Sequence, residues 1–191
     1  MTRPPTPSQT VGPFYGYALP FAKGGDIAPT GHPDTFTLHG RVYDGAGQPV
    51  PDALLEFWQP AADGSRAGAP GSLRRDPVSG AVVGRTGVDF TGFGRVATDA
   101  DGHYTVRTLP PGGGVAYISV CVFARGLLHH LFTRAYLPEL TDPATEPLLA
   151  SLPPRRRATL LAVAEREKVY AFDIRLQNDG DHEETVFLAF D

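Results

Sequence analysis

Apolar and polar residues alternate along several short segments of this chain. The clearest case is residues 116–125, AYISVCVFAR, in which small and aliphatic residues occupy every second position. The positions between them begin at Tyr117 and end at Arg125. Because successive side chains of a strand point to opposite faces, this segment predicts a strand with one core face and a second face of different chemistry.

The same alternation predicts further strands elsewhere in the chain. Turn residues at 44–47 and at 101–102 predict that the first two segments pair as a hairpin and that the next two do the same. Seven or eight short strands are typical of a β-sandwich. The segments concerned are 36–44, 52–59, 94–99, 103–109, 130–137, 169–177 and 184–190.

The remaining segments have other patterns. Residues 1–35 are rich in Pro, Gly and Thr and predict an extended arm that precedes a single domain at 36–191. Residues 61–92 are polar and glycine-rich, so we expect a long excursion there rather than an element. Residues 138–164 carry apolar positions at helical spacing and predict two short helices, broken at Pro153-Pro154. The predicted fold is mainly β, with short helices and an extended N-terminal arm.

Composition and charge exclude several classes of partner. A content of 41% hydrophobic and 20% charged residues is that of a globular protein. The net charge is -4, and the only basic cluster is 155–157, so nothing indicates nucleic-acid binding. No run approaches the ~20 apolar residues of a membrane helix, and a single cysteine excludes an internal disulfide. We therefore expect a cytoplasmic protein with no nucleic-acid or membrane partner.

The histidines and tyrosines do not form an evident metal site. His129 and His130 are adjacent, so on a strand their side chains would diverge. Tyr15 and Tyr17 have the spacing that would place two phenols on one side, and phenolate oxygens suit ferric iron. Their segment is bounded by prolines, however, which favours aromatic packing against a partner.

Nucleophiles and cations give one open question. Ser119 and Cys121 lack a local base that would activate either of them. Arg125, at the end of the predicted strand, has two interpretations: its guanidinium pairs with an acidic residue, or it meets a carboxylate ligand or a partner subunit. The pattern leaves both open, and the residues alone define no complete active site.

Five segments together resemble one protein family. Their joint occurrence is similar to the intradiol aromatic ring-cleavage dioxygenases and, more narrowly, to the alpha subunits of the protocatechuate 3,4-dioxygenases. The resemblance covers nearly the whole chain and implies a prealbumin-like β-sandwich that works within an oxidoreductase. The segments are PSQTVGPF at 7–14, GRVYDGAGQPVPDALLEFWQ at 40–59, GFGRVATDADGHYTVRTLPPG at 92–112, ISVCVFARGLLHHLFTRAYL at 118–137 and YAFDIRLQ at 170–177.

The resemblance also implies where the metal is held. The iron-binding subunits of this family hold Fe(III) with two tyrosines and two histidines, and the histidine pair falls here on Tyr117 and Ser119. The turn that should supply a tyrosine reads PPGGGV at 110–115. The resemblance therefore implies no catalytic or metal-binding residue in this chain, and Fe(III) held by a partner beta subunit. It also implies that Tyr117, Ser119 and Cys121 fill the emptied pocket.

Four other residues receive a role from the same resemblance. In the alpha subunits, the QTxGP segment and the arginine of FARG approach the iron pocket of the partner. This implies that Thr10, Gly12, Pro13 and Arg125 contribute to a shared site for protocatechuate and O2. The implied reaction inserts both atoms of O2 into the ring and gives 3-carboxy-cis,cis-muconate for the beta-ketoadipate pathway.

Two alternatives stay open. A prealbumin-like binding module without an enzymatic partner fits the middle segments but leaves QTVGPF and FARG unexplained. A standalone iron dioxygenase would need Tyr15, Tyr17 and scattered histidines to converge on one ion.

Overall fold

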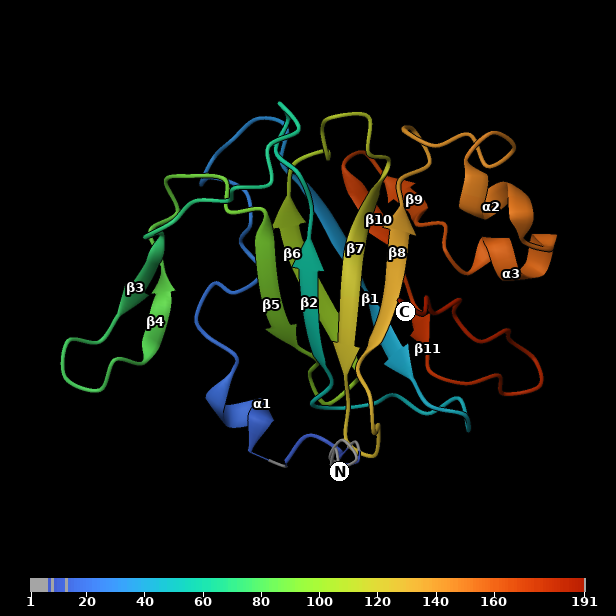
Figure 1. The fold of residues 1–191 in the computed structure, drawn as a ribbon, viewed down its shortest axis with the longest axis horizontal. Coiled ribbons are helices and arrows are strands. Elements are labelled where there is room, and N and C mark those ends of the chain that lie inside the picture. Colours follow the sequence, from blue (N-terminus) through green and yellow to red (C-terminus); the bar gives the residue numbers. More distant parts are fainter. Residues whose placement is uncertain (1–6, 8, 13, 191) are drawn as a thin grey trace, which may run out of the picture.

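The computed structural model describes residues 7, 9–12 and 14–190 and contains two β-sheets packed face to face (Figure 1). The predicted mainly β fold is confirmed, whereas the prealbumin-like topology stays a prediction. In one sheet the order is β5 (Phe93–Ala97), β2 (Leu54–Trp58), β7 (Tyr117–Phe123) and β8 (Leu131–Tyr136). In the other it is β11 (Ile174–Arg175), β1 (Phe36–Tyr43), β10 (Val169–Ala171) and β9 (Val163–Arg166), and β6 (His103–Thr108) also pairs with β1.

The core lies between the two sheets. Leu38 and Val42 of β1 point into it from one side, and Leu55 and Phe57 of β2 point into it from the other; all four side chains are fully buried. β1 runs parallel to β10 and β11 and antiparallel to β6, while the four-stranded sheet is antiparallel throughout. The alternation that predicted the strands thus corresponds to one face packed on the opposite sheet.

The two predicted hairpins are wrong. β1 and β2 belong to different sheets, and so do β5 and β6. A hairpin would have placed the apolar faces of β1 and β2 next to each other on one sheet. Because the connection crosses between the sheets instead, these faces bury each other across the core.

The two short helices are present on either side of Pro153, as α2 (Pro147–Ser151) and α3 (Pro154–Ala158). The helical pattern that continues beyond them is misleading, because residues 163–166 form β9 and pair with β10. Leu160 and Ala162 exchange backbone hydrogen bonds with Tyr136 at the end of β8, and this fixes the chain in an extended course. Residues 184–190 form only an isolated bridge, between Leu188 and Phe132, rather than the predicted strand.

The N-terminal segment and the excursion are more ordered than their composition indicated. The segment contains α1 (Tyr15–Ala18), and its Ile27 is fully buried in the core, with its N–H donating to the Arg107 carbonyl at 2.8 Å. The division of the chain at residue 36 stays a prediction. The excursion contains a hairpin of β3 (Leu73–Arg75) and β4 (Val82–Arg85), which corrects the expectation of no element there. Within the described part of the chain, no helix has the length and apolar character needed to cross a membrane.

Candidate functional site

The two faces of β7 differ as the sequence predicts. Ile118, Val120 and Val122 are at most 1% exposed and face the core. Tyr117 and Ser119 lie on the opposite face, on the outside of the four-stranded sheet, where both are partly exposed. Near the start of β7 the second face is therefore accessible from outside the sandwich.

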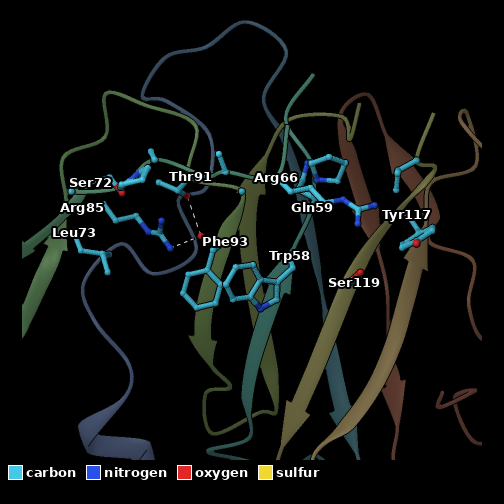
Figure 2. Close-up of a pocket in the computed structure, with 18 of the residues that line it drawn as sticks. Trp58, Gln59, Arg66, Ser72, Leu73, Arg85, Thr91, Phe93, Tyr117 and Ser119 are labelled. Atoms are coloured by element: carbon cyan, nitrogen blue, oxygen red, sulfur yellow. Dashed lines mark hydrogen bonds between the residues drawn. The ribbon is translucent and has the colours of Figure 1, made fainter. Parts of the chain in front are cut away.

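A cavity of about 510 Å³ opens on this outer face near the start of β7 (Figure 2). Tyr117 and Ser119 border it from β7, Trp58 borders it from β2, and Phe93 borders it from β5. The Trp58 and Phe93 rings lie 4.3 Å apart between their centroids, and Trp58 is 53% exposed. The excursion at 66–75 supplies the facing wall.

The expectation that Tyr117, Ser119 and Cys121 fill the emptied pocket stays a prediction for the first two, which border this cavity. The Tyr117 ring stacks against the Arg134 guanidinium, whose carbon lies 4.2 Å from the ring centroid. Cys121 is buried beside Glu56 and does not reach the cavity. Burial and, secondarily, the Glu56 carboxylate raise the pKa of the Cys121 thiol to about 12, so it is a poor nucleophile. The side chains of β7 therefore border the cavity and leave its volume open.

The donor set of the cavity does not fit ferric iron. Its lining includes three guanidinium groups, from Arg66, Arg75 and Arg85, and a single phenol, from Tyr117, but no carboxylate, imidazole or thiol. Fe(III) requires anionic or imidazole donors, and nearby cations oppose its binding. Across the described residues, no group of three or more His, Cys, Asp or Glu side chains is arranged to hold a metal ion.

A second cluster joins the N-terminal segment to the loop that follows β7. The Gly126 N–H donates to the Thr10 hydroxyl at 3.3 Å. The Arg125 guanidinium forms an ion pair with the Asp52 carboxylate at 3.0 Å, and the Tyr15 hydroxyl donates to the Asp52 carbonyl at 2.6 Å. We call Thr10, Tyr15, Asp52, Arg125 and Gly126 the clasp. Of the two interpretations of Arg125, the ion pair with an acidic residue of its own chain is therefore present.

Three of the four predicted contributing residues can be placed. Thr10 and Arg125 both belong to the clasp, and each is exposed at the surface. Gly12 is also exposed, and its carbonyl accepts a hydrogen bond from the Tyr15 N–H at 3.2 Å. Pro13 lies outside the described residues. The structure thus gathers the QTxGP and FARG segments, which are more than a hundred residues apart in the sequence.

The cavity and the clasp lie at opposite ends of β7. Tyr117 begins the strand, and Arg125 follows its last residue by two positions. At about 3.3 Å per residue, the eight steps between them span about 26 Å if the chain stays extended. Figure 1 shows α1 at one end of the sandwich and the loops that connect the β3–β4 hairpin to the sheet toward the other.

The Tyr15 and Tyr17 phenols do not share a side. Tyr15 is 7% exposed and Tyr17 is 88% exposed, because the segment forms the helical turn α1. At 3.6 residues per turn, side chains two residues apart project to nearly opposite sides. Burial, followed by the Asp52 carboxylate, raises the pKa of the Tyr15 phenol. Tyr15 is therefore a packing residue of the clasp.

Comparison with known proteins agrees with this architecture. The family model described as Dioxygenase matches residues 11–117. The protocatechuate 3,4-dioxygenase alpha chain of Burkholderia cepacia is 41% identical, with 96% of each chain covered. The chain belongs to the intradiol ring-cleavage dioxygenase family.

Other members of the family are also similar. The protocatechuate 3,4-dioxygenase alpha chain of Pseudomonas putida is 35% identical over 98% of this chain and 97% of its own length. The beta chain of the Burkholderia cepacia enzyme is 29% identical over 68% of this chain and 55% of its own length. Among solved structures, the dioxygenase domain of a carbohydrate-binding fusion protein from Streptomyces sp. SirexAA-E superimposes with a TM-score of 0.57 at 27% identity, covering 91% and 98% of the two chains.

Sequence reasoning missed the basic lining of the cavity. Arg66, Arg75 and Arg85 lie in the excursion, which also contains three aspartates at 63, 76 and 89. Composition gives no sign that the arginines converge on one cavity while the aspartates point elsewhere. The signal that could have indicated this cavity is Trp58, at the end of a predicted strand, since a large aromatic residue on the polar face of a strand is unusual.

Proposed function

We propose that this chain is the alpha, non-ferric subunit of a protocatechuate 3,4-dioxygenase, and that a beta subunit holds the Fe(III). The enzyme inserts both atoms of O2 into the protocatechuate ring between the two hydroxyl-bearing carbons. When bound by the partner, the metal makes the ring reactive toward O2. This chain supplies part of the pocket wall and of the assembly, and has no catalytic residue of its own.

The observation that carries this proposal is the donor set at the start of β7. Two near full-length relatives are alpha chains of this enzyme, and the positions of the family's histidine pair are Tyr117 and Ser119 here. These two side chains border a cavity that also contains three guanidinium groups. A chain with this lining depends on another polypeptide for metal chemistry.

The clasp is our candidate for this chain's contribution to the shared site. Thr10, Gly12 and Pro13 come from the segment that resembles QTxGP, and Arg125 comes from FARG. The Arg125 side chain is 61% exposed even though it pairs with Asp52. Its guanidinium therefore keeps hydrogen-bond donors available for an anionic group, such as the carboxylate of protocatechuate.

Metal analysis with and without a beta chain tests this proposal. The purified full chain should contain no stoichiometric iron and consume no O2 with protocatechuate. Coexpression with a beta chain should give a complex with one iron per pair of chains and O2 uptake. Iron bound by the chain alone, with tyrosinate charge-transfer absorption, would favour the standalone dioxygenase. Failure to form any complex would favour the binding module. The cytoplasmic location is part of the proposal and rests on the sequence.

A further inference from the structure

The proposed function assigns no ligand to the arginine-lined cavity, which lies at the opposite end of β7 from the clasp. We propose that this cavity is a binding site for a small aromatic carboxylate. The inference does not depend on a beta chain or on iron. It rests on charge, on a buried cation without a counter-ion, and on the aromatic wall.

The charge of the lining is one-sided. Arg66, Arg75 and Arg85 border the cavity, and no aspartate or glutamate does so. The chain as a whole carries a net charge of -4, so the positive charge of this lining is opposite in sign to the net charge of the chain. In a concave site, guanidinium groups attract anions more strongly than the same groups do on an open surface.

Arg85 is the most deeply buried of the three arginines that line the cavity. Its side chain is only 5% exposed, and it donates hydrogen bonds to the carbonyls of Phe93 and Gly24. Its Nε has no hydrogen-bond partner, and no carboxylate among the described residues forms an ion pair with it. A buried charge without a counter-ion destabilises the folded state.

The protonation state of Arg85 supports the same view. Burial lowers its pKa to about 10, although the Asp26 carboxylate acts in the opposite direction. At neutral pH the guanidinium therefore remains charged. An anion bound in the cavity would supply the missing counter-charge, and this gives binding an energetic basis.

The walls select the kind of anion. Figure 2 shows the Trp58 and Phe93 rings side by side, with Arg85 on one side of them and Arg66 and Tyr117 on the other. Such rings hold a flat apolar body by stacking. A volume of about 510 Å³ lies within the range of sites for small organic ligands.

Two of the uncharged polar side chains of the cavity, Gln59 and Thr91, are already hydrogen-bonded. The Gln59 amide donates to the Leu109 carbonyl at 2.6 Å and accepts from the Thr108 hydroxyl at 2.7 Å. The Thr91 hydroxyl donates to the Phe93 carbonyl at 3.0 Å. The guanidinium groups are the charged donors of the lining, and their charge favours a carboxylate attached to an aromatic ring over a neutral ligand.

Tryptophan fluorescence of the full chain tests the proposal directly. Trp58 is the single tryptophan of the sequence and lines the cavity, so excitation at the red edge of its absorption reports on this site alone. Titration with benzoate should give a saturable change in emission. Benzamide, which keeps the ring but lacks the charge, and acetate, which keeps the charge but lacks the ring, should each bind at least tenfold more weakly.

Two variants and a matched control assign the charge to the cavity. Arg66→Gln, in an exposed loop, should weaken benzoate at least fivefold, and Arg85→Met should weaken it at least tenfold. Arg74→Gln changes an exposed arginine of β3 that does not line the cavity and should bind benzoate like the unmodified chain. If circular dichroism shows that Arg85→Met is unfolded, Arg66→Gln decides alone. A change that does not saturate, equal binding of benzamide, or equal binding by Arg66→Gln and Arg74→Gln would overturn the proposal.

Discussion

The role of Arg125 leads to the sharpest prediction, because a structural role and a substrate-facing role differ in magnitude. Arg125 pairs with Asp52 at 3.0 Å, and the two side chains are 61% and 39% exposed. Exposed ion pairs of this kind contribute about 0.2–1 kcal/mol to folding. If Arg125 acts only within the clasp, Arg125→Ala should lower the free energy of unfolding by no more than this and leave turnover within about fivefold.

If the Arg125 guanidinium also contacts the protocatechuate carboxylate, Arg125→Ala should lower turnover more strongly, and mainly for substrates that carry a carboxylate. Hydrogen bonds to charged groups are worth about 1.5–3 kcal/mol, which corresponds to a loss of about 10- to 150-fold in kcat/KM. Catechol lacks the carboxylate, so its turnover should fall much less than that of protocatechuate. We therefore expect the ratio of kcat/KM for protocatechuate to that for catechol to fall at least tenfold in Arg125→Ala.

Asp52→Ala is the matched control for this experiment. It breaks the same ion pair but leaves the guanidinium in place. In urea denaturation we expect Asp52→Ala to resemble Arg125→Ala. In the complex with a beta chain, O2 uptake with protocatechuate and with catechol should give the same ratio of kcat/KM for Asp52→Ala as for the unmodified enzyme. If the two variants lose activity equally, or if Arg125→Ala loses activity equally toward both substrates, Arg125 is a structural residue and its place in the shared site is refuted.

Three further predictions concern the chain itself. Tyr15→Phe removes a hydroxyl that donates to the Asp52 carbonyl at 2.6 Å, so the free energy of unfolding should fall by about 1 kcal/mol; an unchanged urea midpoint would contradict this. Cys121, with a buried thiol and a pKa of about 12, should react with iodoacetamide at pH 8 only when urea unfolds the chain, and rapid alkylation of the native chain would show that the strand opens. Hydrogen bonds, chiefly from the His182 N–H and side chain and from the Asp181 N–H, hold the pKa of Asp179 below the usual carboxyl value. The contribution of Asp179 to stability is therefore present above the unfolded-state pKa and is lost as the pH falls through the lower folded value. The stability lost in Asp179→Asn should accordingly be larger at pH 7 than in strong acid, and a pH-independent difference would count against it.

The strands were predictable from sequence because burial imposes a period of two on each of them. Residues 116–125 show this directly: Ile118, Val120, Val122 and Ala124 of the face assigned to the core are buried, and Ala116 is partly buried. The pairing of the strands was not predictable in the same way. Turn residues at 44–47 fit a hairpin locally, but the apolar face of β1 is satisfied only by the opposite sheet, and that is a property of the whole fold.

The candidate site was predictable only in part, for a related reason. A strand places Tyr117 and Ser119 on one face whatever the fold, so their shared border on the cavity follows from spacing. The arginines that complete the cavity come from an excursion with no periodicity, and the clasp joins Thr10 to Gly126 across 116 positions. The contacts of His39 were also not predictable from the sequence, because its ring contacts His103 at 3.1 Å and Glu165 at 2.8 Å and neither residue is a sequence neighbour.

The separation of the two clusters along β7 has a consequence for how such a chain can change. The core face of the strand is anchored by Ile118 and Val122, both fully buried, and this anchoring fixes the backbone at both ends. Sites that share no side chains and lie well beyond about 10 Å from each other act on stability independently. Substitutions in the cavity, such as Arg66→Gln, should therefore leave the geometry of the clasp intact.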